Sequence, residues 1–235
     1  MISIDNAELF KRHPHIQSQI HAKKLDKLIG YRIAKIEVKL LQKYKAYYKE
    51  AGETNRKTYF EGTQTWFGLH PQVLQTPYND IYEALSSLKD QQISRVVDIG
   101  SAYGRVGLIT KNIFPKASFI GFEIVKKRAD EANRVFGKYN LINCEVVNKN
   151  ILSDDFILPE ADVYFIYDFS DREDIKKAIM LICKRMKSKK FFLFARGDSV
   201  ESILKKKINF ILSKTRYLPD SLIRIYEFRS DSFNC

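Results

Sequence analysis

A chain of 235 residues can bury a full hydrophobic core, and a content of 45% hydrophobic and 13% aromatic residues excludes a disordered protein. No apolar run approaches the roughly 18 residues of a membrane-spanning helix. The formal charge of +12, from 40 basic and 28 acidic residues, favours nucleic acid, acidic protein surfaces or anionic membranes as partners, although a solvated basic surface would show the same bias.

The start of the chain, Met1 to Asp5, does not follow the layout of a signal peptide. The three cysteines, Cys144, Cys183 and Cys235, are scattered, form no metal-binding spacing and indicate a reducing compartment. We therefore expect a soluble, cytoplasmic protein without a metal site.

Residues 1–60 are predicted to form a basic helical extension. Between Ile16 and Glu50, apolar residues recur at steps of three to five, which is typical of one long helix or of two helices separated at Gly30. The apolar side is expected to pack on the rest of the chain or on a partner helix. The other side is basic, and it is either solvated or a recognition surface for an acidic macromolecule. Its basic residues are Lys23, Lys24, Lys27, Arg32, Lys35, Lys39, Lys43, Lys45 and Lys49.

The segment from Trp66 to Tyr78 is predicted to be a loop that leads into a helix, with Thr76 as the N-cap and Pro77 in the first helical position. Trp66 either covers a ligand or packs beneath the start of the helix. A single histidine in this segment, His70, does not indicate a metal site.

From residue 94 onward, apolar runs typical of buried strands alternate with helical periodicity. This alternation predicts a parallel sheet with right-handed crossovers, and a hairpin at residues 215–218 and 222–229 follows it. Two helix starts carry predicted capping boxes, formed by Ser170 with Glu173 and by Asp198 with Glu201. The predicted strands are 95–99, 117–124, 143–148, 162–168 and 190–196, and the predicted helices are 104–114, 126–136, 171–186 and 199–212.

The first of these strands ends in a turn of small residues that contains Asp98, Gly100, Ala102 and Gly104 and opens the next helix. In an open α/β sheet, a nucleotide-like ligand binds at the carboxyl ends of the strands, and small residues allow the backbone to approach it. A carboxylate inside this turn would repel a pyrophosphate but can hold a cationic amino group. The dinucleotide fingerprint G-x-G-x-x-G does not fit, because from Gly100 it requires a small residue where Arg105 stands.

The spacing Asp98-x-Gly100-x-Ala102-x-Gly104 resembles motif I of the class I S-adenosylmethionine-dependent methyltransferases, usually D/E-x-G-x-G-x-G, with alanine in place of the middle glycine. The resemblance covers residues 76–230, because the order of strands and helices and the terminal hairpin are also similar to those of this family. It implies an α/β fold with a doubly wound, seven-stranded, mostly parallel sheet of order 3-2-1-4-5-7-6, in which the last strand is antiparallel. This methyltransferase domain would span residues 61–235, after the N-terminal α-helical extension.

The resemblance also implies a site for S-adenosyl-L-methionine. Asp98 would hold the amino group of the cofactor. Glu123 ends the second strand, matches the acid of motif II and would bind both ribose hydroxyls, unless it is a solvated strand end. Asn150 would contact the adenine amino group, unless it is a turn residue. The full set of expected cofactor contacts is Asp98, Gly100, Ser101, Ala102, Gly104, Glu123, Ile124, Asn150, Ile151, Asp168, Gln75 and Thr76.

Asp168 and Phe169 follow the fourth strand at the position of motif IV, and the resemblance implies that they face the transferable methyl group. Asp168 could orient or deprotonate an acceptor amine, or instead interact with a helix dipole. Phe169 could place its ring against a sulfonium or ammonium cation. Tyr78, with Gln75 and Thr76, is expected to contact the nucleophile, because this segment resembles those that position the substrate in protein-lysine methyltransferases whose motif I also contains G-S-x-x-G-R.

The predicted function is S-adenosylmethionine-dependent methylation of a protein side-chain nitrogen such as that of lysine. The lack of prolines after Asp168 departs from the D/N-P-P-Y/F motif of enzymes that methylate bases. The net charge keeps RNA as the alternative acceptor. Ala102 and the altered motif IV leave open a non-catalytic binding module that kept the fold. The expected partner is an acidic macromolecule, protein before RNA, and the sequence indicates no oligomeric state.

Overall fold

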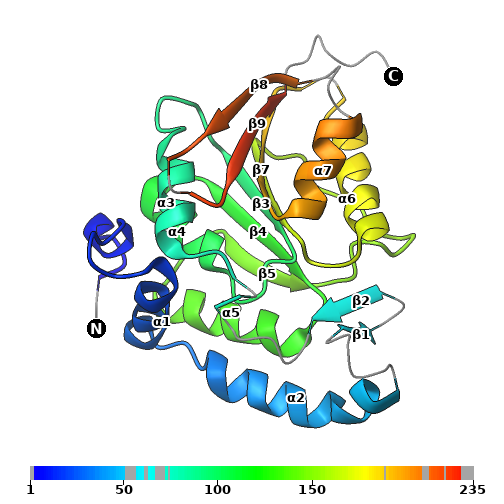
Figure 1. The fold of residues 1–235 in the computed structure, drawn as a ribbon. Coiled ribbons are helices and arrows are strands. Elements are labelled where there is room, and N and C mark those ends of the chain that lie inside the picture. Colours follow the sequence, from blue (N-terminus) through cyan, green and yellow to red (C-terminus); the bar gives the residue numbers. More distant parts are fainter. Residues whose placement is uncertain are drawn as a thin grey trace.

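A computed structural model describes residues 3–50, 57–60, 63–66, 72–73, 75–187, 189–207, 212–219 and 221–228 (Figure 1). At its centre lies a seven-stranded sheet with the order β5-β4-β3-β6-β7-β9-β8. Strands β3 to β7 are parallel, and β9 pairs antiparallel with both β7 and β8. The strand order and the antiparallel last strand confirm the predicted fold. The strands are β3 (Arg95–Ile99), β4 (Ser118–Glu123), β5 (Cys144–Asn148), β6 (Val163–Tyr167), β7 (Phe191–Arg196), β8 (Leu212–Tyr217) and β9 (Arg224–Phe228).

Helices cover both faces of the sheet (Figure 1). Successive strand residues point to opposite faces, so Val96 and Phe165 belong to the hydrophobic cluster under α3, α4 and α5, whereas Val97 and Ile166 belong to the cluster under α6 and α7. Burial on both faces explains why these strands are almost continuously apolar. The helices are α3 (Tyr78–Ser86), α4 (Arg105–Ile113), α5 (Lys126–Lys138), α6 (Arg172–Arg185) and α7 (Asp198–Lys207).

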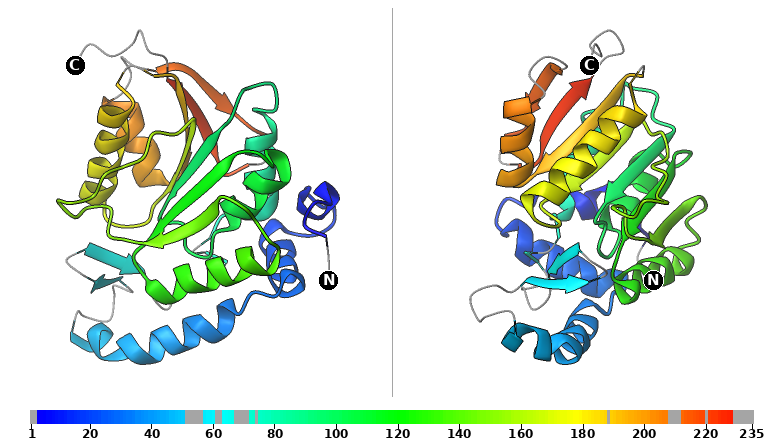
Figure 2. Two further views of the ribbon diagram at one scale, coloured as in Figure 1. Left: turned by 180° about the vertical axis from the view of Figure 1, so that it is seen from behind. Right: turned by 90° about the vertical axis from the view of Figure 1, so that its right-hand side faces the viewer.

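The N-terminal region forms the short 3-10 helix η1 (Ala7–Phe10), α1 (Ser18–Ile29) and α2 (Ile33–Glu50). As predicted, the helical pattern is broken at Gly30, which caps α1 in the left-handed conformation with φ 94°. Side chains of this region, including Phe10, Leu25 and Ile29, are buried in the same cluster as α3 to α5. Figure 2 shows α2 running beside α5. The extension therefore packs on the sheet domain and shares its core.

Strands β1 (Lys57–Phe60) and β2 (Thr63–Trp66) form an antiparallel hairpin that was not predicted. The boundary expected after residue 60 falls inside this hairpin, and Trp66 lies in a strand where a loop was expected. His70 lies outside the described residues. Within the part of the chain that the structure describes, no helix is both long and apolar enough to cross a membrane.

The predicted helix caps are wrong in detail. The N-cap of α3 is Pro77, one residue later than expected, and α6 is capped by Asp171, whose side chain accepts a hydrogen bond from the backbone N–H of Asp174. Ser170 instead donates its hydroxyl to the Asp174 carboxylate at 2.6 Å. A carboxylate can accept hydrogen bonds from the backbone N–H groups at the start of any helix that lies close in space. Spacing along the sequence does not predict such a partner.

The predicted helix 199–212 also differs from the structure, because β8 already begins at Leu212. The first part of the predicted helix is α7. The Asp168 carboxylate, at the end of β6, accepts hydrogen bonds from the backbone N–H groups of Ser199 and Val200 at the start of α7, in the place expected for Asp198.

Candidate active site

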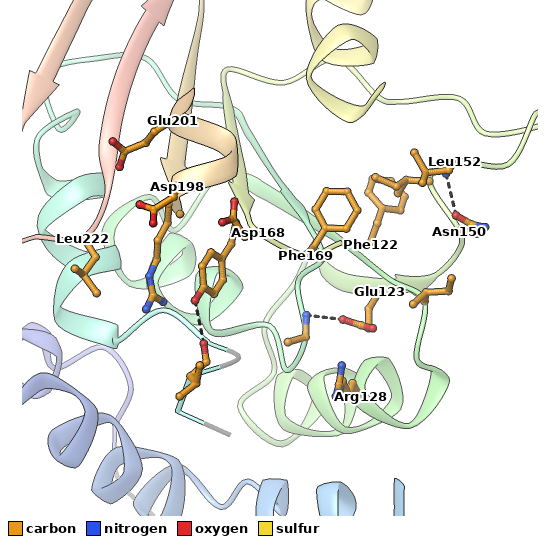
Figure 3. Close-up of a pocket in the computed structure, with 18 of the residues that line it drawn as sticks. Phe122, Glu123, Arg128, Asn150, Leu152, Asp168, Phe169, Asp198, Glu201 and Leu222 are labelled. Atoms are coloured by element: carbon orange, nitrogen blue, oxygen red, sulfur yellow. Dashed lines mark hydrogen bonds between the residues drawn. The ribbon is translucent and has the colours of Figure 1, made fainter. Parts of the chain in front are cut away.

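A cavity of about 580 Å³ opens at the carboxyl ends of the parallel strands (Figure 3). This volume is typical of a site for a small ligand. We call it the main cavity. Glu123 and Asn150 lie at one end, Asp198 and Leu222 at the other, and Asp168 lies between them (Figure 3). Eight of the predicted site residues line it: Gly100, Ala102, Glu123, Ile124, Asn150, Ile151, Asp168 and Phe169.

The turn after β3 brings the backbone close to the main cavity. Gly100 has φ 73°, and a Cβ atom at this position would lie 2.7 Å from Cβ of Phe169. Ala102 also has a left-handed backbone, with φ 46°. An L-residue is strained by about 1–2 kcal/mol in this region, which explains why a glycine is usual at this point of the motif.

Asp98 lies beneath this turn and is 7% exposed. No hydrogen bond or ion pair joins its carboxyl group to another described residue, and burial together with the nearby charge of Glu123 raises the pKa of Asp98 to about 8. Asp98 lines a recess of about 40 Å³, and Gly100 and Ala102 line both this recess and the main cavity. A cationic group bound there would offset the burial of the carboxylate.

Glu123 is held in place by the backbone. Its Oε2 accepts from the N–H of Ala102 at 2.9 Å, and its Oε1 accepts from the N–H of Val125 at 2.8 Å. Burial raises the pKa of Glu123, while the Arg128 guanidinium and these two N–H groups oppose the shift. Because two carboxylate oxygens offer about four acceptor sites, the oriented group can still accept hydrogen bonds from a ligand.

The end of the main cavity beyond Glu123 is mostly apolar. Ile151 is buried and lines the cavity, together with Ile124 and Phe122. Asn150 forms a turn in which its Oδ1 accepts from the N–H of Leu152 at 2.9 Å. These surroundings suit the flat, apolar faces of a purine.

Asp168 projects from the end of β6 to the rim of the main cavity. Its Oδ2 accepts from the N–H of Ser199 at 3.2 Å and its Oδ1 from the N–H of Val200 at 3.1 Å, so the carboxylate caps α7. A Cβ atom at Gly197 would lie 2.3 Å from Cγ of Asp168, so the close approach requires glycine there. The carboxylate thus has a structural partner whatever it does in the cavity.

Not all predicted residues meet in the main cavity. Gln75, Thr76 and Ser101 line the recess beside Asp98. Tyr78 lies in the core, fully buried, and its hydroxyl donates to Oδ1 of Asp26 at 2.9 Å. The expected contact of Tyr78 with a nucleophile is therefore wrong, because the ring lies in the core and not in the cavity. Gly104 is the N-cap of α4 and lies against Phe136.

The sequence-based prediction missed the three arginines of the main cavity, Arg128, Arg196 and Arg224. Arg128 is bound by Glu37 of α2, with distances of 2.8 Å from Nε to Oε1 and 3.1 Å from Nη2 to Oε2. This pair could not be predicted from local sequence patterns, since the partners are 91 residues apart. Arg196 ends β7 directly before Gly197, and a charged residue at the end of a buried strand could have been noticed.

The sequence matches no protein-family model and no curated protein sequence. Solved structures share the fold. The S-adenosylhomocysteine-bound methyltransferase PaMTH1 of Podospora anserina has a TM-score of 0.54 and 10% identity, over 69% of this chain and 82% of that chain. The putative methyltransferase yhhF of Escherichia coli has a TM-score of 0.51 and 14% identity, over 63% and 86%. TrmN of Thermus thermophilus has a TM-score of 0.51 and 15% identity, over 67% and 49%.

The chain spans about half the length of some of these structures, such as TrmN at 49% and the mitomycin 7-O-methyltransferase MmcR at 53%. Identities of 10–17% establish the arrangement of strands and helices and nothing finer. The protein has the fold of the class I S-adenosylmethionine-dependent methyltransferases.

Proposed function

We propose that the protein is an S-adenosylmethionine-dependent methyltransferase. The observation that carries this proposal is the pair of buried carboxyl groups at the turn after β3. Asp98 is buried without a partner among the described residues, and Glu123 is oriented by two backbone N–H groups. Asp98 would bind the ammonium group of an amino acid, and Glu123 would bind the two hydroxyls of a ribose. S-adenosylmethionine carries both groups.

In this proposal the chain's residues hold the two halves of the cofactor at adjacent strand ends. Asp98 binds the amino group, and Glu123 accepts hydrogen bonds from the ribose hydroxyls. Ile124 and Ile151 pack on the adenine, and Asn150 contacts its amino group. The cofactor, when bound, supplies an electrophilic methyl group on a sulfonium, whose cation Phe169 can contact with its ring.

The proposed acceptor is a nitrogen of a protein side chain, as in lysine. Its lone pair forms the new bond to the methyl carbon, the carbon–sulfur bond breaks, and the electron pair stays on sulfur. A charged ammonium has no free lone pair, so a proton must leave first, and Asp168 at the cavity rim is the proposed group that orients the amine or accepts the proton. RNA is the second proposed acceptor, supported by the net charge of +12. A cytoplasmic location is proposed from the cysteine content.

Transfer of a radiolabelled methyl group into cell lysate tests the acceptor class. Label that is lost after protease treatment but not after ribonuclease treatment supports a protein acceptor, and the reverse supports RNA. Calorimetric titration with S-adenosylmethionine tests the enzyme itself, because a non-catalytic module that merely kept the fold should show no micromolar binding.

The variant Glu123→Ala tests the ribose contact. It should weaken S-adenosylmethionine binding by about 1.5–3 kcal/mol, the loss expected for charge-assisted hydrogen bonds, while the protein still folds. Unchanged affinity in a folded variant would place the ribose elsewhere. Tight binding of NAD in place of S-adenosylmethionine would contradict the proposed cofactor.

A further inference from the structure

Arg196 is a half-buried cation that has no hydrogen-bond or ion-pair partner among the described residues. It ends β7, and its guanidinium stacks on the ring of Tyr167 with 4.3 Å from Cζ to the ring centroid. Its Nη1 is buried without a hydrogen-bond partner. Among the described residues, none accepts a hydrogen bond from this side chain or forms an ion pair with it. Burial lowers the pKa of Arg196 from its ordinary value, although arginine remains protonated at neutral pH.

The acids nearest to Arg196 are bound to other groups. Asp80 and Asp168 both attract it electrostatically. However, Asp80 accepts from Arg12 at 2.8 Å, and Asp168 caps α7. Arg224 lines the same cavity and differs in this respect, because its Nε lies 2.6 Å from Oε2 of Glu201. A charge that is partly removed from water and lacks a bonded partner is unfavourable, so the place of Arg196 in a cavity favours an anionic ligand.

Arg196 lies where three hollows meet. It lines the main cavity and comes two residues before Asp198, which lies at the end away from Glu123 (Figure 3). It also lines the recess beside Asp98 and a third hollow of about 370 Å³, which we call the side hollow. One wall of the side hollow is α1, which contributes Gln19, Ile20 and Lys23. The exposed Lys23 adds positive charge to this route. An anionic ligand entering over α1 would therefore reach Arg196 without crossing the proposed adenosine end.

We propose that Arg196 binds an oxyanion of the methyl acceptor, a carboxylate or a phosphate, that enters through the side hollow. This inference rests on the proposed methyltransferase function and adds the charge of its substrate. A guanidinium presents a planar fork of donors that matches both oxyanions, and stacking on Tyr167 holds that plane in place. The residue is thus a specificity determinant and not part of the proton transfer.

The test uses the full chain loaded with S-adenosylhomocysteine, with sodium acetate and sodium phosphate as probes against sodium chloride of equal ionic strength. Saturating anion should raise the melting temperature of the wild type by about 2–4 °C. Arg196→Met should lose this rise, and Arg196→Lys should keep part of it. The matched control Arg224→Met, which removes a paired cation from the same cavity, should keep the rise. The anion with the larger effect identifies the acceptor group as a carboxylate or a phosphate.

The absence of any anion effect in the wild type, or an equal rise in wild type and Arg196→Met, would overturn the proposal. So would a large drop in the melting temperature of Arg196→Met without anions, because a residue that awaits a ligand should be dispensable for folding.

Calorimetry with S-adenosylhomocysteine and with 5′-methylthioadenosine, which lacks the amino acid part, separates acceptor from cofactor. Both affinities should be unchanged in Arg196→Met. A tenfold loss for S-adenosylhomocysteine alone would assign Arg196 to the carboxylate of the cofactor and overturn the acceptor role. Failure of the wild type to bind S-adenosylhomocysteine would instead refute the proposed function, and the anion effect could still be measured on the unloaded protein.

Discussion

Two regions of this molecule differ in whether their ionisable groups have bonded partners. Where the N-terminal helices meet the sheet domain, Asp26 binds Arg105 and Glu37 binds Arg128. In the main cavity and its recess, Asp98 is buried and Arg196 is half-buried, and neither has a bonded partner among the described residues. A charged group that is removed from water is stable when it has an oppositely charged partner. The charged groups of the first region have such partners within the protein, whereas those of the second region would gain them only from a ligand.

The paired region connects the N-terminal helices to the proposed cofactor site. Arg105, the first residue of α4, donates from Nε to Oδ1 of Asp26 at 3.1 Å, and the Tyr78 ring lies under its guanidinium at 4.8 Å. Glu37 also accepts from the Tyr103 hydroxyl at 2.6 Å. The helices thus fix Tyr103, which lies in the turn after β3, and Arg105, which directly follows that turn. This contact gives the extension a structural role, while recognition of an acidic partner by its basic face stays a prediction.

Removing one member of a buried pair should have the largest effect. Glu37→Ala leaves the Arg128 guanidinium buried without its two acceptor oxygens and should lower the free energy of unfolding by about 3–5 kcal/mol. Urea unfolding followed by circular dichroism measures this change. The control Glu8→Ala breaks the exposed pair with Lys11 and should leave the urea midpoint unchanged. Equal midpoints for both variants would mean that the pairing at Glu37 does not hold the helices in place.

The sequence was sufficient for the sheet because its signals are local. Apolar runs and the turn from Asp98 to Gly104 specify strands, crossover helices and the carboxyl edge where ligands bind. The hairpin β1–β2 was missed because it lies outside that alternation.

The site was predicted where residues end a strand or lie in the loop that follows it. Glu123 and Asp168 were found in this way. The roles of Glu37 and Asp26 depend on partners 91 and 79 residues away, which periodicity cannot reveal. Tyr78 was misplaced because its role was carried over from a resemblance, which does not show which side of the helix faces the core.

Asp168 connects the two regions, because it is a bonded acid that also lines the cavity. Asp168→Asn keeps one oxygen to cap α7, so the free energy of unfolding should fall by no more than about 1 kcal/mol. If the carboxylate orients or deprotonates the acceptor, turnover should fall by about one to three powers of ten while the affinity for S-adenosylmethionine stays nearly the same. Single-turnover methyl transfer and calorimetry measure the two quantities. Full turnover in the folded variant would restrict Asp168 to its capping role.

Mutation of Asp98 should raise the free energy of unfolding, whereas mutation of Glu37 should lower it. Its pKa is raised to about 8 in the folded chain, against about 4 when unfolded, so the folded state holds the extra proton between these values. Stability from this group therefore falls as the pH rises from about 4 to 8. Asp98→Asn should be more stable than the wild type at pH 8 without ligand, and it should bind S-adenosylmethionine about 10- to 100-fold more weakly.

The affinity of the wild type should also depend on pH, because Asp98 must lose its proton to hold the ammonium of the cofactor. Calorimetry should show affinity rising up to tenfold per unit toward pH 8, where the free amino group itself begins to deprotonate. Asp98→Asn should lack the rising limb. A flat profile in the wild type between pH 6 and 8 would argue against an ionised contact at this position.

The smallest effect is expected at Ala102, where the strain is in the backbone and no charge is involved. Its φ of 46° costs an alanine about 1–2 kcal/mol, while glycine loses about 0.4–1 kcal/mol of chain entropy on folding, so Ala102→Gly should stabilise the protein by up to about 1 kcal/mol. The N–H that binds Glu123 is kept, so the affinity for S-adenosylmethionine should not fall. Ala102→Val is the matched control, since a β-branched residue is still more strained there. If Ala102→Gly instead lowers the free energy of unfolding, the Ala102 methyl group contributes packing around the turn. The empty ligand site would then be more stable than its unpaired charged groups indicate.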